Sequence, residues 1–333
     1  MIKKIIFISF LFISTSINAF QFNLRSKDIT VSGISSGAFF AHQFHIAFNS
    51  KVSGAAMFAG GPFYCAKGSS SKALGRCMNG KESYNLASES FESIKKLAKR
   101  NRVDAINKIK KDRVYIFAGM NDTVVSSAVP YQLKRLYHLL GLKNESISMV
   151  DDMMAGHTYP TISYGNPCAT PKKSPFISSC NYDGAYESLS YLYPKKTSSM
   201  NVEKGELLKI DQTKFFKRGL GKPLMQESAY IYIPKFCENG GECDFHVAFH
   251  GCSQTVDHIE TQYVMNTGIN EAADKLNLIV LYPQAKKATI PGRNPYGCWD
   301  WWGHSGSEYH TKKGQQLSIV ARMIQDLTDI DLL

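Results

Sequence analysis

Apolar residues along the chain recur with two periods, one typical of buried strands and one typical of amphipathic helices. Short runs rich in β-branched and aromatic residues predict strands within 28–34, 52–61, 113–125, 146–161, 228–234, 245–251 and 278–285. Apolar residues three and four positions apart predict helices within 37–50, 93–113, 129–142, 262–277 and 314–327. This alternation predicts an α/β fold with a mostly parallel central sheet and helices on both faces.

The sequence also predicts the arrangement of two strands and the character of one long region. The strands at 228–234 and 245–251 are expected to lie side by side. The region 162–200 is expected to be irregular, because Cys168 and Cys180 bracket a loop rich in proline and serine.

The N-terminal segment 1–19 has the layout of a secretory signal peptide. Lys3 and Lys4 precede an apolar run from Ile5 to Ile13, which is short for a membrane span, and small and polar residues follow. A membrane anchor is the alternative. No later stretch approaches membrane-spanning length, so we expect an exported protein, either periplasmic or extracellular. No linker or repeat divides the rest, so 20–333 is expected to be a single domain.

The charge of the chain is basic, with a formal net value of +11 that includes two lysines of the expected signal peptide. Much of the excess lies in 93–113, where apolar residues recur at helical spacing. Two amphipathic helices with solvated basic faces explain this pattern better than a nucleic-acid patch does. No nucleic-acid partner is therefore expected.

Eight cysteines in an exported chain indicate disulfides, because an oxidising compartment leaves few free thiols. They are Cys65, Cys77, Cys168, Cys180, Cys237, Cys243, Cys252 and Cys298. Zinc is the competing interpretation, but no CxxC pair is present, so no metal is expected. Eight cysteines allow 105 pairings. Sequential pairing of neighbours along the chain is a hypothesis that rests on locality alone.

The segment "GISSG" at 33–37 matches the GxSxG pattern with Ser35 at the nucleophile position. A strand is predicted before it and a helix after it, which is the context that a nucleophile elbow needs. The alternative is a structural glycine-rich turn. The glycines favour the elbow, because its strained backbone leaves no room for bulky neighbours.

A serine nucleophile needs a base, and the base needs an orienting acid. Asp122 lies in the loop that ends the segment 113–125, and His157 lies in the loop that ends the segment 146–161, so both follow Ser35 in the order of α/β hydrolases. Asp151 and Asp152 are alternative acids. Asp122 is favoured because loops at strand ends carry catalytic groups in such folds.

An oxyanion hole needs two backbone N–H groups, and the residue after the nucleophile, Ser36, usually gives one. The other normally comes from a loop early in the chain that is often marked by His-Gly. Here that feature is "VAFHGCSQ", far behind the serine, and the amide of Cys252 is the candidate. The order predicts a circularly permuted α/β-hydrolase fold, whose usual first strands stand at the C-terminal end.

Seven segments in this order resemble the circularly permuted poly(3-hydroxybutyrate) depolymerases and related exported polyester esterases. They are "VSGISSGAFFAHQFHIAF", "AGMNDTVV", "GHTYPT", "CNYDGA", "YIPKFC", "VAFHGCSQ" and "YGCWDWWG". The resemblance implies Ser35 as nucleophile, His157 as general base and then acid, and Asp122 as its partner, with the Ser36 and Cys252 amides as oxyanion hole. It implies ester hydrolysis through an acyl-enzyme without cofactor or metal. We expect the protein to be a monomer.

All three tryptophans, Trp299, Trp301 and Trp302, lie with Tyr296 in one short segment. They could form an aromatic wall that packs a polyester chain, or a cluster in the core. The resemblance assigns one tryptophan here to substrate binding, and Trp302 is our candidate.

The substrate class leaves alternatives open. Acetyl or feruloyl esters on polysaccharide could be cleaved by the same elbow, and a non-catalytic surface-binding protein could keep the fold. The chain lacks the linker and separate polymer-binding domain of many depolymerases of solid polymer. Amorphous chains and soluble oligomers are therefore more plausible substrates than crystalline polymer.

Overall fold

A computed structural model of the chain describes residues 22–194, 202–216, 223–288 and 294–333. The expected signal peptide at 1–19 lies outside the described residues. No helix within these ranges is long and apolar enough to cross a membrane.

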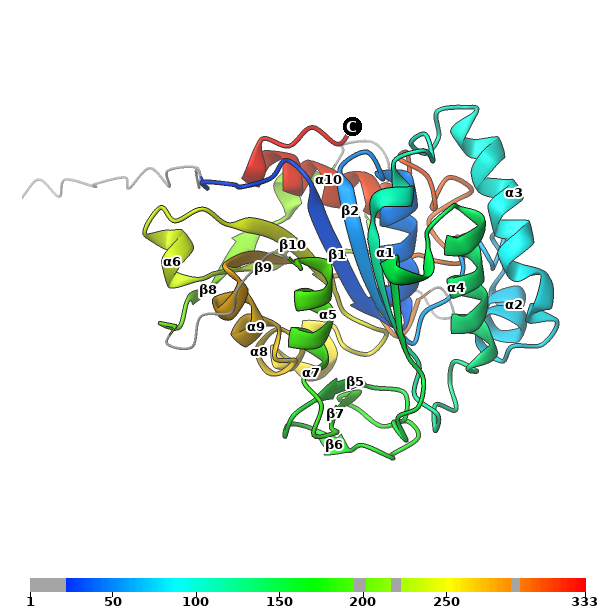
Figure 1. Cartoon of the computed structure of the whole chain (residues 1–333), viewed down its shortest axis with the longest axis horizontal. Helices are drawn as coiled ribbons and strands as arrows, with labels where there is room; N and C mark the ends of the chain where they lie inside the picture. The colour runs from blue at the N-terminus through cyan, green and yellow to red at the C-terminus, as the bar shows by residue number, and fades with distance from the viewer. Residues whose placement is uncertain (1–21, 195–201, 217–222, 289–293) are drawn as a thin grey trace, which may run out of the picture.

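An eight-stranded sheet forms the centre of the molecule (Figure 1). Its strands, in spatial order, are β4 (Ile147–Val150), β3 (Arg113–Phe117), β2 (Val52–Phe58), β1 (Ile29–Ile34), β10 (Asp244–Phe249), β11 (Leu278–Tyr282), β9 (Ser228–Ile233) and β8 (Glu206–Asp211). The neighbours from β4 to β11 pair in parallel, whereas β9 pairs antiparallel with both β11 and β8. The expected mostly parallel sheet is confirmed, and β1 lies in its interior.

Helices cover both faces of this sheet (Figure 1). One face carries α1 (Ser36–Ala47), α3 (Leu86–Ala98), α4 (Ala128–Leu139) and α10 (Gln315–Thr328). The other face carries α5 (Gly184–Leu192), α8 (Gln262–Asn266) and α9 (Ile269–Leu276).

Alternating residues of the strands separate two apolar cores. In β3, Val114 and Ile116 belong to the core under α1, whereas Tyr115 and Phe117 belong to the core under α5. Strands that are buried on both faces in this way read as continuous apolar runs, which explains why the sequence signal for them was strong.

The two strands expected to be neighbours, β9 and β10, are separated by β11. All five residues of β11 are buried, as suits an inner strand, whereas β9 keeps partly exposed positions and lies next to the edge strand β8. The neighbour prediction was therefore wrong. The edge strand β8 was not predicted, because its charged and half-exposed residues give a weak strand pattern.

Two predicted helices differ in the structure. Within 93–113 only the end of α3 is helical, and a short 3₁₀ turn at Ile109–Lys111 replaces the second helix. Between α3 and β3 the backbone instead bonds to other elements, since the N–H of Asp104 donates to the Ala47 carbonyl at 3.1 Å and the Arg102 carbonyl accepts the N–H of Lys312 at 3.0 Å. The segment 262–277 divides into α8 and α9, because Gly268 adopts φ +81° between them.

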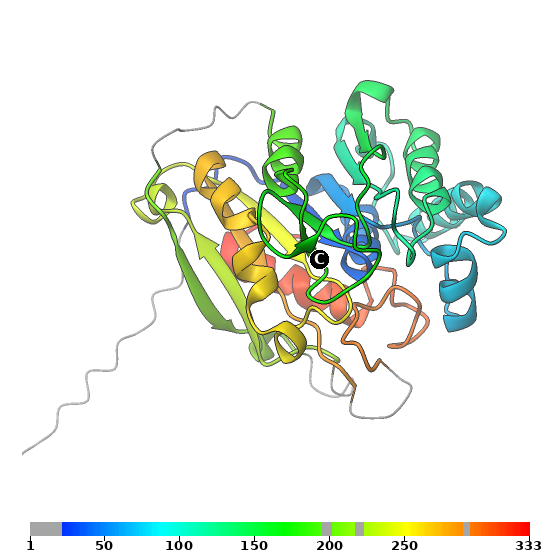
Figure 2. The ribbon, with the colours of Figure 1, turned by 90° about the horizontal axis from the view of Figure 1, so that it is seen from below.

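The region expected to be irregular contains α5 and most of a second sheet. Its three strands are β5 (Tyr159–Thr161), β7 (Ile177–Ser179) and β6 (Asn166–Pro167). The small sheet lies at one end of the large sheet in Figure 1 and in front of it in Figure 2. Its strands have only two or three residues each, which is too short for a period to show in the sequence.

Four disulfides close loops around the sheet. They join Cys65 to Cys77, Cys168 to Cys180, Cys237 to Cys243 and Cys252 to Cys298. This is the sequential pairing that locality suggested.

Candidate active site

A sharp turn between β1 and α1 presents Ser35. Its backbone has φ 54° and ψ −121°, a conformation that side-chain-bearing residues rarely adopt. A Cβ on Gly33 would lie 2.4 Å from the carbonyl oxygen of Gly37, and one on Gly37 would lie 2.3 Å from that of Phe249. Both glycines are therefore required by main-chain contacts, as the elbow interpretation predicts.

The register of the sheet brings the loop after β10 beside Ser35. Gly33 of β1 pairs with Phe249 of β10, so the segments that follow these two strands leave the sheet side by side. A Cβ on Gly251 would lie 3.4 Å from that of Ser35. The parallel sheet thus brings segments more than 200 positions apart together at one point.

Asp122 and His157 form a buried pair. The Nδ1–H of His157 donates to Asp122 Oδ2 at 2.8 Å, and the exposed fractions of the two side chains are 5% and 3%. The other carboxylate oxygen of Asp122 accepts the backbone N–H groups of Val124 at 2.7 Å and Val125 at 2.9 Å. With both oxygens occupied, the carboxylate holds the imidazole in one orientation and leaves Nε2 for chemistry.

Main-chain contacts hold these two loops together. The N–H of Asn121 donates to the carbonyl of Ala155 at 2.9 Å, and a Cβ on Gly119 would lie 2.2 Å from the same oxygen. The N–H of His157 donates to the carbonyl of Pro171 at 2.7 Å. The alternative acids Asp151 and Asp152 precede this contact and form no hydrogen bond with His157 within the described residues.

The two candidate oxyanion donors come from two different segments, the start of α1 and the loop after β10. Ser36 is the first residue of α1, where backbone N–H groups have no partner inside the helix. Cys252 lies in the loop after β10, and its N–H has no hydrogen-bond partner among the described residues. Both amides therefore remain available to an oxyanion.

His250 and Gln254 shape the Cys252 loop. The N–H of Ala285 donates to Nε2 of His250 at 3.1 Å, so the Nδ1–H of His250 donates to the Gly251 carbonyl at 2.7 Å. Burial lowers the pKa of His250 to about 4, which keeps the ring neutral in this role. The Gly251 N–H donates to Oε1 of Gln254 at 2.7 Å, and the Gln254 amide donates to the Pro175 carbonyl at 2.8 Å.

A cavity of about 360 Å³ opens over this arrangement. Ser35, His157 and Cys252 all line it. The rest of its lining is mostly apolar and consists of Ile34, Ser70, Ala73, Leu74, Met78, Val124, Lys172, Phe176, Gly251, Ser253, Gln254, Asn294, Pro295, Tyr296, Cys298, Trp301 and Trp302. An apolar cavity with a few convergent polar groups is the usual form of a small-molecule site.

Three of the four expected wall aromatics line the cavity, namely Tyr296, Trp301 and Trp302. Trp299 does not, and its place in the expected aromatic wall was wrong. Its ring is fully buried and stacks on Phe40 of α1 at 4.6 Å between centroids. For Trp299 the core interpretation holds, because its ring belongs to the apolar core under α1. Trp301 and Trp302 belong to a separate apolar cluster.

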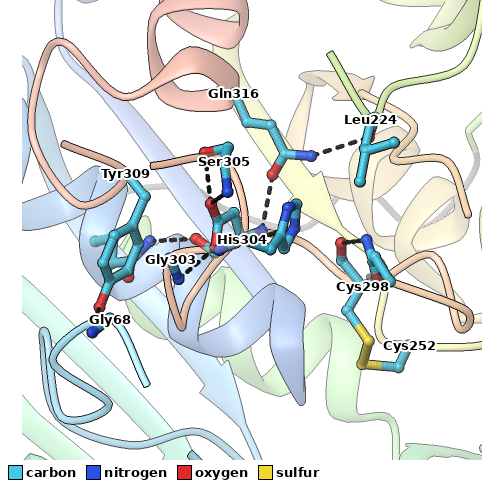
Figure 3. A network of polar contacts seen from close by, with 12 residues as sticks. Gly68, Leu224, Cys252, Cys298, Gly303, His304, Ser305, Tyr309 and Gln316 are labelled. Carbon is cyan, nitrogen blue, oxygen red and sulfur yellow. Dashed lines mark hydrogen bonds and ion pairs between the residues drawn. A yellow bond between two sulfur atoms is a disulfide. The ribbon is translucent and has the colours of Figure 1, made fainter. Parts of the chain in front are cut away.

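The carboxylate of Asp300 organises the segment that carries these aromatics, residues 294–305, which we call the aromatic loop. Oδ1 accepts the N–H groups of Gly303 at 2.7 Å and His304 at 3.0 Å, and Oδ2 accepts the N–H of Ser305 at 2.8 Å. The N–H of Asp300 donates to Gln316 of α10 at 2.8 Å. Figure 3 shows Gly303, His304, Ser305 and Gln316 gathered around this point.

The disulfide between Cys252 and Cys298 ties the aromatic loop to the Cys252 loop (Figure 3). The N–H of Ser253 also donates to the carbonyl of Tyr296 at 2.7 Å. The side chain of Asn294 donates to the Cys298 carbonyl at 2.8 Å. Two loops distant in sequence therefore form one continuous wall of the cavity.

Sequence reasoning missed Gln254 and Asp300 as organisers of the site. Each acts on the backbone of its own loop and on a distant element. The sequence predicted roles for Cys252 in "HGCSQ" and for the tryptophans in "CWDWWG". A polar residue inside a loop, however, has no periodic signal that reveals its partners. Within the described residues, no group of three or more His, Cys, Asp or Glu side chains is placed to hold a metal ion.

Comparisons with known proteins found relatives of one kind, the PHB depolymerases. A family model described as "Esterase PHB depolymerase" matches residues 230–329. The chain is 33% identical over 317 residues to a poly(3-hydroxybutyrate) depolymerase of Delftia acidovorans, an alignment covering 94% of this chain and 62% of that protein. It is 33% identical over 322 residues to a polyhydroxybutyrate depolymerase of Talaromyces funiculosus, covering 92% of this chain and 91% of that protein. The chain thus spans about three fifths of the Delftia protein's length.

Two solved structures share the fold. One is a PHB depolymerase from Penicillium funiculosum, and the other is a PHB depolymerase with a serine-to-alanine substitution, complexed with R3HB trimer. Each superposes with a TM-score of 0.83 at 30% identity, covering 94% of this chain and 99% of that chain.

Proposed function

This chain belongs to the poly(3-hydroxybutyrate) depolymerase family of esterases, and we propose that it hydrolyses ester bonds of poly(3-hydroxybutyrate) or of its oligomers. The observation that carries the proposal is the cavity itself. It contains a serine in a strained elbow and the ring of a histidine that is fixed by a buried carboxylate. This is the constellation that activates a serine toward an acyl carbon.

The proposed reaction proceeds through an acyl-enzyme. The Ser35 hydroxyl attacks the ester carbonyl while Nε2 of His157 takes its proton, and Asp122 stabilises the resulting imidazolium. The oxyanion of the tetrahedral intermediate accepts hydrogen bonds from the amides of Ser36 and Cys252. Collapse breaks the ester C–O bond, and His157 gives its proton to the leaving alcohol. A water molecule activated by His157 then releases the acid and restores Ser35.

The lining of the cavity supports a polyester substrate. Its largely apolar surface, with Trp301 and Trp302 in the aromatic loop, suits the methyl-bearing backbone of 3-hydroxybutyrate units. One of the two related PHB depolymerases is complexed with R3HB trimer, which is a short polyester chain of this kind. We assign substrate binding to Trp302, Trp301 and Tyr296.

The same proposal includes export and a permuted chain. The signal-like segment 1–19 and the pairing of all eight cysteines support an oxidising compartment outside the cytoplasm. The oxyanion loop after β10 stands next to the elbow after β1, although it comes far later in the chain, which supports circular permutation. We propose that the enzyme acts as a monomer, because the cavity is lined within one chain.

The test compares two adjacent serines in a product-release assay. Purified wild type, Ser35→Ala and Ser36→Ala are incubated with poly(3-hydroxybutyrate), 3-hydroxybutyrate oligomers and acetylated xylan, and products are identified by mass. Ser35→Ala should lower turnover by at least about 10⁴-fold, because it removes the nucleophile. Ser36→Ala keeps the backbone amide and should stay within about tenfold of wild type.

Two results would overturn the assignment. Undiminished turnover by Ser35→Ala would remove the nucleophile from the mechanism. Release from acetylated xylan without release from either hydroxybutyrate substrate would move the substrate to polysaccharide esters. Circular dichroism of each variant checks that the fold is retained.

A further inference from the structure

One basic side chain, that of Lys172, lines the cavity. Of the described residues that line the cavity, it is the only lysine or arginine, and no aspartate or glutamate is among them. The remaining lining is apolar or neutral apart from the His157 ring. A cation in a cavity without a carboxylate favours an anionic group on the ligand.

Lys172 is not engaged by the protein. Its side chain is exposed, and it forms no ion pair or side-chain hydrogen bond among the described residues. Most basic residues that form ion pairs here do so at the surface, such as Lys67 with Glu89 and Lys214 with Asp326. The ammonium of Lys172 therefore remains available to a ligand.

The backbone of Lys172 is held beside His157. The preceding residue, Pro171, accepts the N–H of His157 at 2.7 Å, and the Cys168 carbonyl accepts the N–H of Gly156 at 2.9 Å. A Cβ on Gly156 would lie 1.8 Å from the Thr170 carbonyl oxygen, so the two segments touch through main chain. The position of Lys172 relative to the general acid is thus fixed, although its side chain can move.

This position is on the side of the leaving group, because His157 must reach the ester oxygen that departs. In an oligomer of 3-hydroxybutyrate the departing alcohol carries the rest of the chain toward its carboxyl end. When the bond cleaved is near that end, the departing piece carries a free carboxylate. An ammonium and a carboxylate form a charge-assisted hydrogen bond.

We propose that Lys172 is a specificity-determining residue that binds the terminal carboxylate of the leaving piece. The inference rests on the proposed function. It makes soluble oligomers with a free acid end better substrates than esterified ones and directs cleavage toward the carboxyl end. In the step concerned, the acyl carbon bonds to the Ser35 oxygen, the ester C–O bond breaks, the leaving oxygen takes the proton held by His157, and the carboxylate stays ionised against Lys172. One water molecule is consumed later, when the acyl-enzyme is hydrolysed.

The experiment compares two substrates that differ only in this charge, the 3-hydroxybutyrate trimer as free acid and as methyl ester. Wild type, Lys172→Gln, Lys172→Arg and the control Lys173→Gln are assayed for kcat and KM. Lys173 is the adjacent exposed lysine and does not line the cavity. Lys172→Gln should raise KM for the free acid about fivefold and leave the methyl ester unchanged, because an exposed ion pair contributes modestly.

The other variants and salt sharpen the result. Lys172→Arg should retain the preference for the free acid, and Lys173→Gln should match wild type on both substrates. Added salt should reduce the preference in wild type and have little effect on it in Lys172→Gln.

The outcomes separate this inference from the function beneath it. Equal changes on both substrates, or no change on either, would overturn the role of Lys172 while leaving the esterase intact. Failure of the wild type to cleave either trimer would overturn the proposed function and this inference with it. Product analysis by mass of a trimer whose carboxyl-terminal unit is isotopically labelled adds a second criterion, since Lys172→Gln should release less labelled monomer relative to labelled dimer.

Discussion

The two walls of the cavity are held in place by different kinds of contact. The elbow wall consists of Ser35, Asp122 and His157, and its loops leave the carboxyl ends of β1, β3 and β4. The aromatic loop, residues 294–305, contains no strand or helix. Residues of both walls line one cavity. A comparison of the walls therefore shows what strands and helices provide to a site and what side-chain contacts provide.

The elbow wall is fixed by main chain. Its loops begin at strand ends that the parallel ladder holds in register, and they approach so closely that glycine is required at Gly33, Gly37, Gly119 and Gly156. Main-chain contacts of this kind cannot rotate away. The wall that would carry the chemistry therefore has little freedom to adjust.

The aromatic loop is fixed by side chains. The carboxylate of Asp300, the amide of Asn294 and the Cys252–Cys298 disulfide replace the missing ladder. Side-chain supports can be exchanged singly without a clash, so this wall can vary in sequence and shape while the elbow stays unchanged. We infer that the packing of the substrate chain is tuned in the aromatic loop and that the reaction type is set by the elbow wall.

The largest effect should come from adding one methyl group to the elbow wall. In Gly37→Ala the new Cβ would lie 2.3 Å from the Phe249 carbonyl oxygen and 2.4 Å from that of His250. We expect the free energy of unfolding to fall by at least about 5 kcal/mol, because both atoms are main chain. Any protein that folds should lose at least about a hundredfold in turnover, since the Cys252 loop would shift from Ser35.

Gly75→Ala is the matched control. A Cβ at Gly75 meets nothing within 4 Å, and its residue lies in a helical segment near the cavity. Its stability, measured by urea unfolding beside Gly37→Ala, should equal or slightly exceed that of wild type. Similar stability of both variants would mean that main-chain contact does not define the elbow wall.

The second effect concerns the disulfide that anchors the aromatic loop to the loop after β10. Replacing Cys252 and Cys298 by serine opens a loop with a sequence separation of 46 residues. Loop entropy predicts a loss of about 4 kcal/mol in the free energy of unfolding. Turnover should also fall, because the oxyanion loop and the aromatic loop would lose their shared anchor.

The disulfide between Cys237 and Cys243 provides the comparison, with a separation of six residues and no residue in the cavity lining. Its double serine variant should lose only about 2 kcal/mol and keep the wild-type turnover. Urea unfolding under non-reducing conditions and an oligomer assay measure both pairs. Equal losses of turnover in the two variants would argue against a specific role for the Cys252–Cys298 disulfide.

The same contrast explains what the sequence could reveal. The elements of the elbow wall have local signals: apolar strand runs, a GxSxG turn, and an acid and a histidine at strand ends. All were predicted from the sequence, and the structure brings Asp122 and His157 within hydrogen-bond distance. Their catalytic roles stay predictions. Sequential disulfide pairing also succeeded because the partners are near in the chain.

The aromatic loop could not be predicted in this way. Trp299 and Trp302 have similar composition around them, yet one is fully buried and the other lines the cavity. What separates them is the orientation set by Asp300, whose partners include Gln316 on a different element. Such contacts join distant positions and leave no periodic pattern. The order of β9, β11 and β10 escaped prediction for the same reason.

The smallest effect should come from Asp300→Asn, which keeps the size of the side chain but removes one acceptor oxygen. The N–H of Ser305, which now donates to Oδ2 at 2.8 Å, would face an amide group. Because one of several hydrogen bonds is lost, we expect about 1–3 kcal/mol less stability. The displaced Trp301 and Trp302 should raise KM for oligomers several-fold while kcat changes little, since Ser35 and its partners stand on the other wall.

Kinetics on the 3-hydroxybutyrate trimer measure this separation of KM from kcat, with Ser305→Ala as a milder companion that removes only the hydroxyl donor to Asp300. A fall in kcat with an unchanged KM would show that the aromatic loop acts on the reaction itself, and the division of labour between the two walls would then fail. The expected ordering, with Asp300→Asn affecting KM more than Ser305→Ala does, follows from the number of loop amides that the carboxylate holds. A loop held by side chains should loosen in steps, whereas an elbow held by main chain should fail at the first added methyl group.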